Sequence, residues 1–213
     1  AAHPDVTGVG EPGFAHRLGR SALGLDAANI VPFDQISTKY HTELSARFPG
    51  LRRAADKSIM SYMVMGVLHA VMPEARFLIV DRDPRDNLLS IYRNSFGQGA
   101  HRYAYDFDDL VVHRRSMLDM IDYWEDRLDG RIAHVSYETL VANPEPQAKA
   151  LVASAGLTWD PACLDFYKRK GTVTSLSVAQ VRQPIYRSST EVWRRYGTAV
   201  DPLIEALEKD GQI

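Results

Sequence analysis

The stretch that most constrains the fold runs over residues 75–90 and reads ARFLIVDRDPRDNLLS. Its apolar run at residues 77–80 lies between turn signals, which predicts a strand at residues 76–80 that is buried on both faces. A helix should begin at once, because Asp83 can accept free backbone N–H groups and Pro84 suits the first helical position. The leucines that follow extend this helix to Phe96. A buried strand leading directly into a helix is typical of a parallel sheet covered by helices.

The remaining sequence continues this alternation. A second strand is predicted at residues 131–136, whereas the first fifty residues are loop-rich and predict only short helices. Apolar spacing and turn signals predict further helical segments at residues 59–72, 110–124, 137–141, 145–155 and 203–207 and around Trp193. We therefore expect an α/β fold, with a parallel sheet flanked by helices.

Composition narrows the class of partner. The chain has 213 residues, enough for one α/β domain, and a net charge of −2, which gives no overall field for nucleic acid. Its single cysteine, Cys163, rules out an internal disulfide and favours a reducing compartment. The most apolar stretch, residues 59–72, is too short and too polar to span a membrane. We expect a cytoplasmic protein with no membrane segment in this chain.

Arg82 and Ser90 are the first candidates for a ligand site. Arg82 follows the predicted strand, and ligands of open parallel sheets bind beyond the carboxyl ends of strands. A guanidinium and a hydroxyl could hold a phosphate there, although a capped helix with a surface ion pair explains the same residues. Asp81 and Asp83 form an acid-x-acid pattern, but the seven histidines show no paired metal spacing, so no metal site is expected.

A family resemblance favours the phosphate. Arg82 and Ser90, with seven residues between them after an apolar strand, resemble the 3′-phosphate motif of sulfotransferases that use 3′-phosphoadenosine-5′-phosphosulfate (PAPS). Four further segments are similar, in the same order, to segments of tyrosylprotein sulfotransferases and of bacterial sulfotransferases linked to tetratricopeptide repeats. They are AHPDVTGVGE at 2–11, VSYETLVANPE at 135–145, SLSVAQVRQPIY at 175–186 and WRRY at 193–196. The resemblance implies a three-layer, nucleotide-kinase-like (P-loop NTPase-like) fold.

The resemblance implies two catalytic residues. Glu11 falls on the family's general base, which takes the proton of the acceptor hydroxyl. Lys57 falls on the lysine that neutralises charge on the leaving phosphate, although Ser58 stands where the family commonly has Asp-Pro or Met-Pro after the lysine. Without the resemblance, Glu11 would be read as a helix cap and Lys57 as a solvated surface residue.

The resemblance also implies a set of cofactor-binding residues. Arg82 and Ser90 would hold the 3′-phosphate, and Tyr137 would contact the nucleotide or, alternatively, serve as a core aromatic residue. Ser177 and Arg182 lie in the segment that covers the cofactor in the family, where a guanidinium can reach a phosphate. The implied reaction transfers a sulfuryl group from PAPS to an acceptor hydroxyl and requires no metal.

One element of the family pattern is not found in the 213 residues. The 5′-phosphosulfate loop, a Gly/Arg/Ser/Thr-rich turn between the first strand and first helix, would precede residue 1. We therefore expect residues 1–213 to form a single sulfotransferase domain, truncated at the N-terminus by its first strand–loop–helix.

Three alternatives stay open. The chain could be a non-catalytic sulfotransferase-like binding module, a nucleotide kinase, or a metal-dependent glycosyltransferase that uses Asp81 and Asp83. The acceptor also stays open among peptide tyrosine, carbohydrate and small-molecule hydroxyls. Several side chains could line its entrance or belong to a surface loop, namely Tyr103, Tyr105 and the arginines at 102, 114 and 115.

Overall fold

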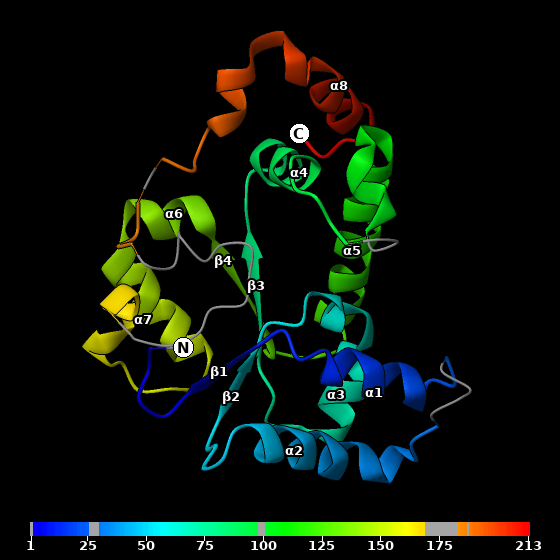
Figure 1. Ribbon diagram of the computed structural model, residues 1–213, viewed down its shortest axis with the longest axis vertical. Helices are drawn as coiled ribbons and strands as arrows, with labels where there is room; N and C mark the ends of the chain where they lie inside the picture. Colours follow the sequence, from blue (N-terminus) through cyan, green and yellow to red (C-terminus); the bar gives the residue numbers. More distant parts are fainter. Residues whose placement is uncertain (1, 26–29, 98–100, 169–182, 187) are drawn as a thin grey trace.

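The computed structural model describes residues 2–25, 30–97, 101–168, 183–186 and 188–213. Four strands alternate with helices along this part of the chain (Figure 1). They are β1 (Thr7–Gly10), β2 (Ala54–Asp56), β3 (Phe77–Asp81) and β4 (Ile132–Ser136).

The strands pair in two parallel couples. β1 pairs with β2, and Gly10 at the end of one strand is the register partner of Asp56 at the end of the other. β3 pairs with β4 in unbroken register, which brings Asp81 opposite Ser136. Within each couple, the chain therefore leaves both strands at the same edge. Among the described residues, the two couples form separate two-stranded parallel sheets.

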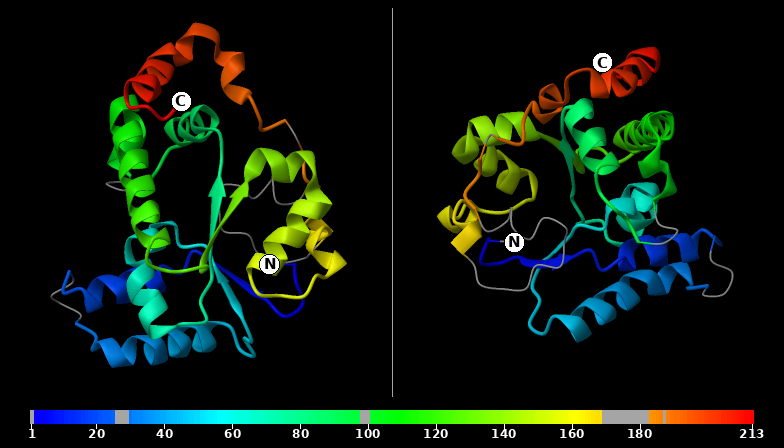
Figure 2. Two further views of the ribbon diagram at one scale, coloured as in Figure 1. Left: turned by 180° about the vertical axis from the view of Figure 1, so that it is seen from behind. Right: turned by 45° about the horizontal axis from the view of Figure 1, so that its top comes forward.

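Helices flank these short sheets, which confirms the α/β class. The α-helices are α1 (Phe14–Ala22), α2 (Ile36–Arg47), α3 (Met65–Val71), α4 (Pro84–Tyr92), α5 (Phe107–Glu125), α6 (Tyr137–Ala142), α7 (Pro144–Ser154) and α8 (Asp201–Lys209). The 3-10 helices are η1 (Phe33–Gln35), η2 (Ile59–Val64), η3 (Arg102–Tyr105), η4 (Pro161–Cys163), η5 (Phe166–Lys168) and η7 (Val192–Val200). As Figures 1 and 2 show, α6 and α7 lie on one side of β3 and β4, and α5 lies on the other.

Helix boundaries follow local chemistry where caps exist. Asp83 accepts the backbone N–H groups of Arg85 and Asp86, and Pro84 occupies the first turn of α4, as predicted. The helix ends at Tyr92, four residues before the predicted end at Phe96. The single helix predicted at residues 59–72 is divided into η2 and α3.

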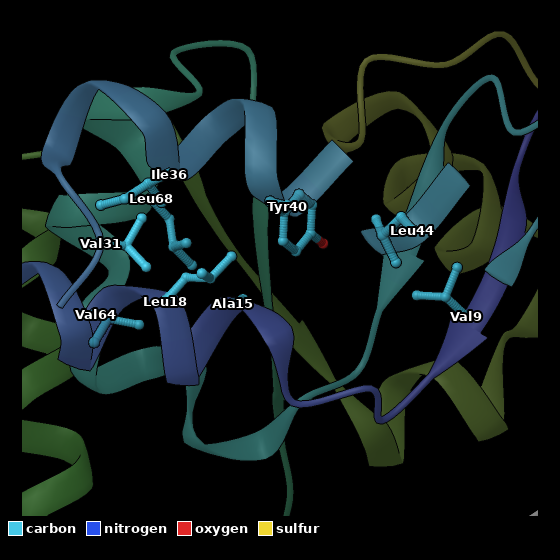
Figure 3. Close-up of a cluster of buried hydrophobic side chains, with 9 residues drawn as sticks. All are labelled: Val9, Ala15, Leu18, Val31, Ile36, Tyr40, Leu44, Val64 and Leu68. Carbon is cyan, nitrogen blue, oxygen red and sulfur yellow. The ribbon is translucent and has the colours of Figure 1, made fainter. Parts of the chain in front are cut away.

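The first hydrophobic core joins β1 to the helices α1, α2, α3 and η2. Leu18 of α1, Ile36 and Leu44 of α2 and Val64 of η2 are almost completely buried in it (Figure 3). Tyr40 of α2 also belongs to this core and is 8% exposed. The turn after β1 therefore rests on a rigid, close-packed base.

Two further hydrophobic clusters pack β3 and the helices around it. One packs Trp124, Ile121 and Leu128 against the sheet residues Phe77 and Ile79. The other lies between α4, α5 and the C-terminal helices, with Leu88, Leu89, Leu110, Val200, Leu203 and Leu207 buried in it. α8 and η7 consequently arch over α4 (Figures 1 and 2).

Candidate functional site

Both pairs of parallel strands bring together candidate residues at their carboxyl ends. Glu11 follows β1 and Lys57 follows β2, whereas Arg82 follows β3 and Tyr137 follows β4. We call these two places the Glu11–Lys57 corner and the Arg82–Tyr137 corner. Their position agrees with the general rule that ligands of parallel sheets bind where the strands end.

At the Glu11–Lys57 corner, two exposed side chains of opposite charge form an ion pair. Lys57 Nζ donates to Glu11 Oε1, and the two side chains are 65% and 46% exposed. The backbone N–H of Lys57 donates to the carbonyl of Gly10 over 2.8 Å, so the chain before Glu11 is tied to the chain at Lys57. A carboxylate and an ammonium thus lie together where a bound molecule can reach both.

The turn after Glu11 is shaped by glycines and held by Ser58. Gly10 and Gly13 have φ values of 73° and 69°, which only glycine adopts without strain. The N–H of Gly13 donates to Ser58 Oγ over 3.0 Å. Ser58, the residue that departs from the family pattern, therefore has a defined contact with the turn that carries Glu11.

At the Arg82–Tyr137 corner, a guanidinium lies over an aromatic ring. Arg82 Cζ is 5.1 Å from the centre of the Tyr137 ring, and Arg82 Nη2 donates to the carbonyl of Ser189 over 2.7 Å. Arg82 Nε is buried without a hydrogen-bond partner among the described residues. A buried donor of this kind is costly unless an acceptor reaches it, which fits a phosphate oxygen at this place.

A bridge from α6 fixes the chain just after Arg82. Glu138 Oε1 accepts the backbone N–H of Asp83 over 2.9 Å, so the turn after β3 is tied to the turn after β4. Asp83 in turn pairs with Arg85 at 2.5 Å. Burial opposes ionisation of Asp83, but the hydrogen bonds and charge of Arg85 outweigh it, and the pKa of Asp83 lies below its usual value.

The other predicted cofactor residues are less closely joined. Ser90 lies exposed on α4, and its carbonyl accepts from Asn94 Nδ2 over 2.7 Å. No hydrogen bond links Ser90 to Arg82 in the described part of the chain. Ser177 and Arg182 lie outside the described residues.

The C-terminal segment covers α4 and contacts the Arg82–Tyr137 corner through Ser189. Asp86 is 2% exposed, and its Oδ1 accepts the backbone N–H of Trp193 over 2.9 Å. Arg85 lies 4.4 Å from the Trp193 ring, and Arg93 lies 5.1 Å from the Tyr196 ring. The sequence did not predict Asp86 or Trp193 as site residues, although Asp86 lies between Arg82 and Ser90 and Trp193 begins the WRRY segment.

Three of the residues considered for an acceptor entrance have other partners. Arg115 donates to Asp210 through Nε over 2.9 Å, and Arg114 Nη1 donates to Gln212 over 2.5 Å. Tyr103 stacks on His113 with 3.7 Å between ring centres. These groups stabilise the packing of α5, η3 and the C-terminus.

The acidic residues near β3 do not converge. Asp83 pairs with Arg85, whereas Asp81 accepts from His134 Nδ1 over 2.6 Å. Within the described ranges, no group of three or more His, Cys, Asp or Glu residues could hold a metal ion. No helix in those ranges is long and apolar enough to cross a membrane.

Comparison with known proteins gives two matches. The model of a family described as the sulfotransferase family matches residues 2–161. An uncharacterized protein of Aquifex aeolicus (strain VF5) is 30% identical over 159 residues, which cover 74% of this chain and 21% of that protein. The chain thus spans about a fifth of the relative's length. The family match includes the Glu11–Lys57 corner and the Arg82–Tyr137 corner, and the chain belongs to the sulfotransferase family.

Proposed function

We propose that this protein transfers a sulfuryl group from PAPS to an acceptor hydroxyl, with Glu11 as the general base. The observation that carries the proposal is the contact between Glu11 and Lys57 at the aligned ends of β1 and β2. A carboxylate and an ammonium side by side supply a proton acceptor and a cation at one point. Membership in the sulfotransferase family supports the choice of sulfur chemistry.

When bound, PAPS supplies the sulfuryl group and carries the electrons of the broken S–O bond away on adenosine 3′,5′-bisphosphate. Glu11 receives the proton of the acceptor hydroxyl as the oxygen forms its bond to sulfur. Once Glu11 is neutral, the charge that holds Lys57 is gone. The flexible lysine side chain is then free to follow the negative charge that develops on the leaving group.

Arg82 holds the 3′-phosphate in this proposal. Its unpaired Nε needs an acceptor, and a guanidinium matches phosphate oxygens in shape and charge. Tyr137 supports the guanidinium from one side, and Ser189 takes one of its donors. Ser90, Ser177 and Arg182 complete the proposed cofactor set by family position.

We also propose that a strand–loop–helix outside residues 1–213 supplies the 5′-phosphosulfate cradle and completes a three-layer, nucleotide-kinase-like sheet. β2 and β3 each have a strand partner on one edge only among the described residues. Val80 of β3 is 60% exposed, although its register partner Val135 is 7% exposed. An additional parallel strand between β2 and β3, with its helix, would cover this surface and satisfy both edges.

The matched relative is much longer than the aligned stretch, which supports a domain that works within a larger chain. We propose that this protein is functionally related to the tyrosylprotein and repeat-linked bacterial sulfotransferases, and that it acts in the bacterial cytoplasm. The acceptor belongs to the hydroxyl class, as a peptide tyrosine, a carbohydrate or a small molecule.

The test is transfer of labelled sulfate from PAPS by the full-length protein to a panel of a phenol, a tyrosine peptide and an oligosaccharide. Glu11→Gln should lower turnover roughly 100- to 10,000-fold, because the base is lost while the shape is kept. Glu145→Gln is the matched control, since Glu145 also pairs with a lysine, Lys149, but on the surface of α7. Equal activity of the two variants would exclude Glu11 as the base. Absence of transfer by the wild-type protein to every acceptor would favour a non-catalytic binding module.

A further inference from the structure

We propose that Asp56, Ser58 and Tyr40 are positioning residues that hold the turn carrying Glu11 in register with Lys57. This inference rests on the proposed function. It concerns three side chains that neither the family resemblance nor the comparisons bring into the site. They form one chain of hydrogen bonds that runs from the interior of the protein to the Glu11–Lys57 corner.

Asp56 is the centre of this chain. It is the last residue of β2 and lies directly before Lys57. Its Oδ2 accepts from the Tyr40 hydroxyl over 3.0 Å. Its Oδ1 accepts from both the backbone N–H and the hydroxyl of Ser58, over 2.9 Å and 2.6 Å. A carboxylate is suited to this place because its two oxygens accept from all three donors at once.

The direction of these bonds determines what Ser58 can do. The Ser58 hydroxyl has one proton, which it uses in the hydrogen bond that it donates to Asp56. Its oxygen is therefore left to accept, and it accepts the backbone N–H of Gly13 over 3.0 Å. Asp56 thus orients Ser58 so that Ser58 can hold Gly13.

The consequence for Glu11 comes from the spacing of the anchors. Lys57 N–H holds the carbonyl of Gly10, and Ser58 Oγ holds the N–H of Gly13. Glu11 and Pro12 lie between these two anchors, and Pro12 has a fixed φ angle. The two residues of the turn are therefore clamped against two consecutive residues at the end of β2, one of which is Lys57.

Tyr40 forms the inner end of this chain of hydrogen bonds and is held in the hydrophobic core. Tyr40 is 8% exposed and packs in the core between α1 and α2. Burial raises the pKa of Tyr40, and the charge of Asp56 and its hydrogen bond raise it further. The phenol therefore stays protonated and keeps donating to Asp56. An exposed charged pair is in this way connected to a buried side chain.

The primary test measures amide hydrogen exchange at Gly13, which needs no enzymatic activity. Ser58→Ala should speed this exchange roughly tenfold, because the Gly13 N–H loses its acceptor. Ser58→Thr retains a hydroxyl and should restore protection. Ser116→Ala is the matched control, since the Ser116 hydroxyl donates to the carbonyl of Val112 within α5, in an exposed position. Unchanged Gly13 exchange in Ser58→Ala would overturn the inference.

A second readout links the chain to turnover. In Ser58→Ala, kcat should fall roughly tenfold while the Kd for adenosine 3′,5′-bisphosphate stays within about twofold, because the Arg82–Tyr137 corner is intact. Faster Gly13 exchange with unchanged kcat would show that the bonds exist but do not position the base. If the wild-type protein turns over no acceptor, the proposed function fails, and Gly13 exchange still decides whether the chain holds the turn.

Discussion

The Glu11–Lys57 corner and the Arg82–Tyr137 corner both pair the residue after one strand with the residue after its parallel neighbour. Their surroundings differ. Glu11 and Lys57 are exposed. The turn that carries Glu11 is held on its inner side by backbone hydrogen bonds and by the series Gly13–Ser58–Asp56–Tyr40, which ends at a tyrosine in the hydrophobic core. Arg82 is half-buried, and its guanidinium donates to the carbonyl of Ser189 in the C-terminal segment, which is itself held to α4 by the bond between Asp86 and the backbone N–H of Trp193.

The difference agrees with a division of labour. A group that must exchange a proton with an incoming acceptor has to stay accessible, and its position must come from contacts on its inner side. A group that only binds gains from exclusion of water, which strengthens its interaction with a phosphate. We therefore expect damage to the C-terminal cover to affect nucleotide binding and to spare the Glu11–Lys57 corner.

The largest effect on this cover should come from Leu203→Ala. Leu203 of α8 is fully buried against α4 and α5, so the change should lower the free energy of unfolding by about 2–5 kcal/mol. Urea denaturation measures this loss, and Glu205→Ala, on the exposed side of α8, should stay within about 0.5 kcal/mol of wild type. A loss below about 1 kcal/mol for Leu203→Ala would contradict tight packing of the cover.

A smaller effect is expected from Asp86→Ala, which removes the anchor of Trp193. The backbone N–H of Trp193 would be left without its acceptor, at a cost of about 1–3 kcal/mol in the free energy of unfolding. Asp86→Asn keeps an oxygen in the same place and should recover most of the loss. Chemical denaturation followed by tryptophan fluorescence measures both variants. Equal losses in the two would show that the charge of Asp86, and not its hydrogen bond, is what matters.

The smallest expected effect is a pH dependence of the β3–β4 sheet. When His134 is charged, its two ring nitrogens donate at once to the carboxylates of Asp81 and Glu125. Burial lowers its pKa, but the hydrogen bonds and charges of the two carboxylates outweigh burial and raise the pKa above 6.5. The stabilisation by charged His134 is thus fully present below the unfolded pKa of about 6.5 and is lost as the pH rises through the folded pKa.

Because the His134 side chain is 41% exposed, this contribution should be below about 1 kcal/mol. Comparing the free energy of unfolding of wild type and His134→Ala at about pH 5.5 and about pH 8.5 isolates it. The advantage of wild type should be larger at the lower pH. A larger advantage at the higher pH would mean that the neutral imidazole is the form that the fold favours.

Sequence reasoning found one half of the fold more readily than the other. β3 and β4 were predicted because each is a local apolar run followed by a helix signal, and the Asp83 cap with Pro84 is equally local. β1 and β2 were missed because Thr7–Gly10 contains two glycines and Ala54–Asp56 has no large apolar residue. These short strands owe their conformation to pairing with each other and to the core below, which no local pattern records.

The same distinction holds for the site. Glu11, Lys57, Arg82 and Tyr137 were predicted by family resemblance, and the structure brings them together in two pairs. The residues that hold them were not predicted, because each acts over a long sequence separation. Ser58 reaches Gly13 across 45 residues, and Asp86 reaches Trp193 across 107.

The central claim, that the two corners have separate roles, is tested most directly by calorimetric titration of adenosine 3′,5′-bisphosphate into the full-length protein and its variants. Arg82→Ala should weaken binding roughly 10- to 100-fold, the range expected for a hydrogen-bonded charge. Arg76→Ala, at the opposite end of β3, is the matched control and should bind as wild type does. Glu11→Gln should retain wild-type affinity within about twofold. Unchanged affinity in Arg82→Ala, or a loss of affinity in Glu11→Gln as large as that in Arg82→Ala, would contradict the division between a reactive corner and a binding corner.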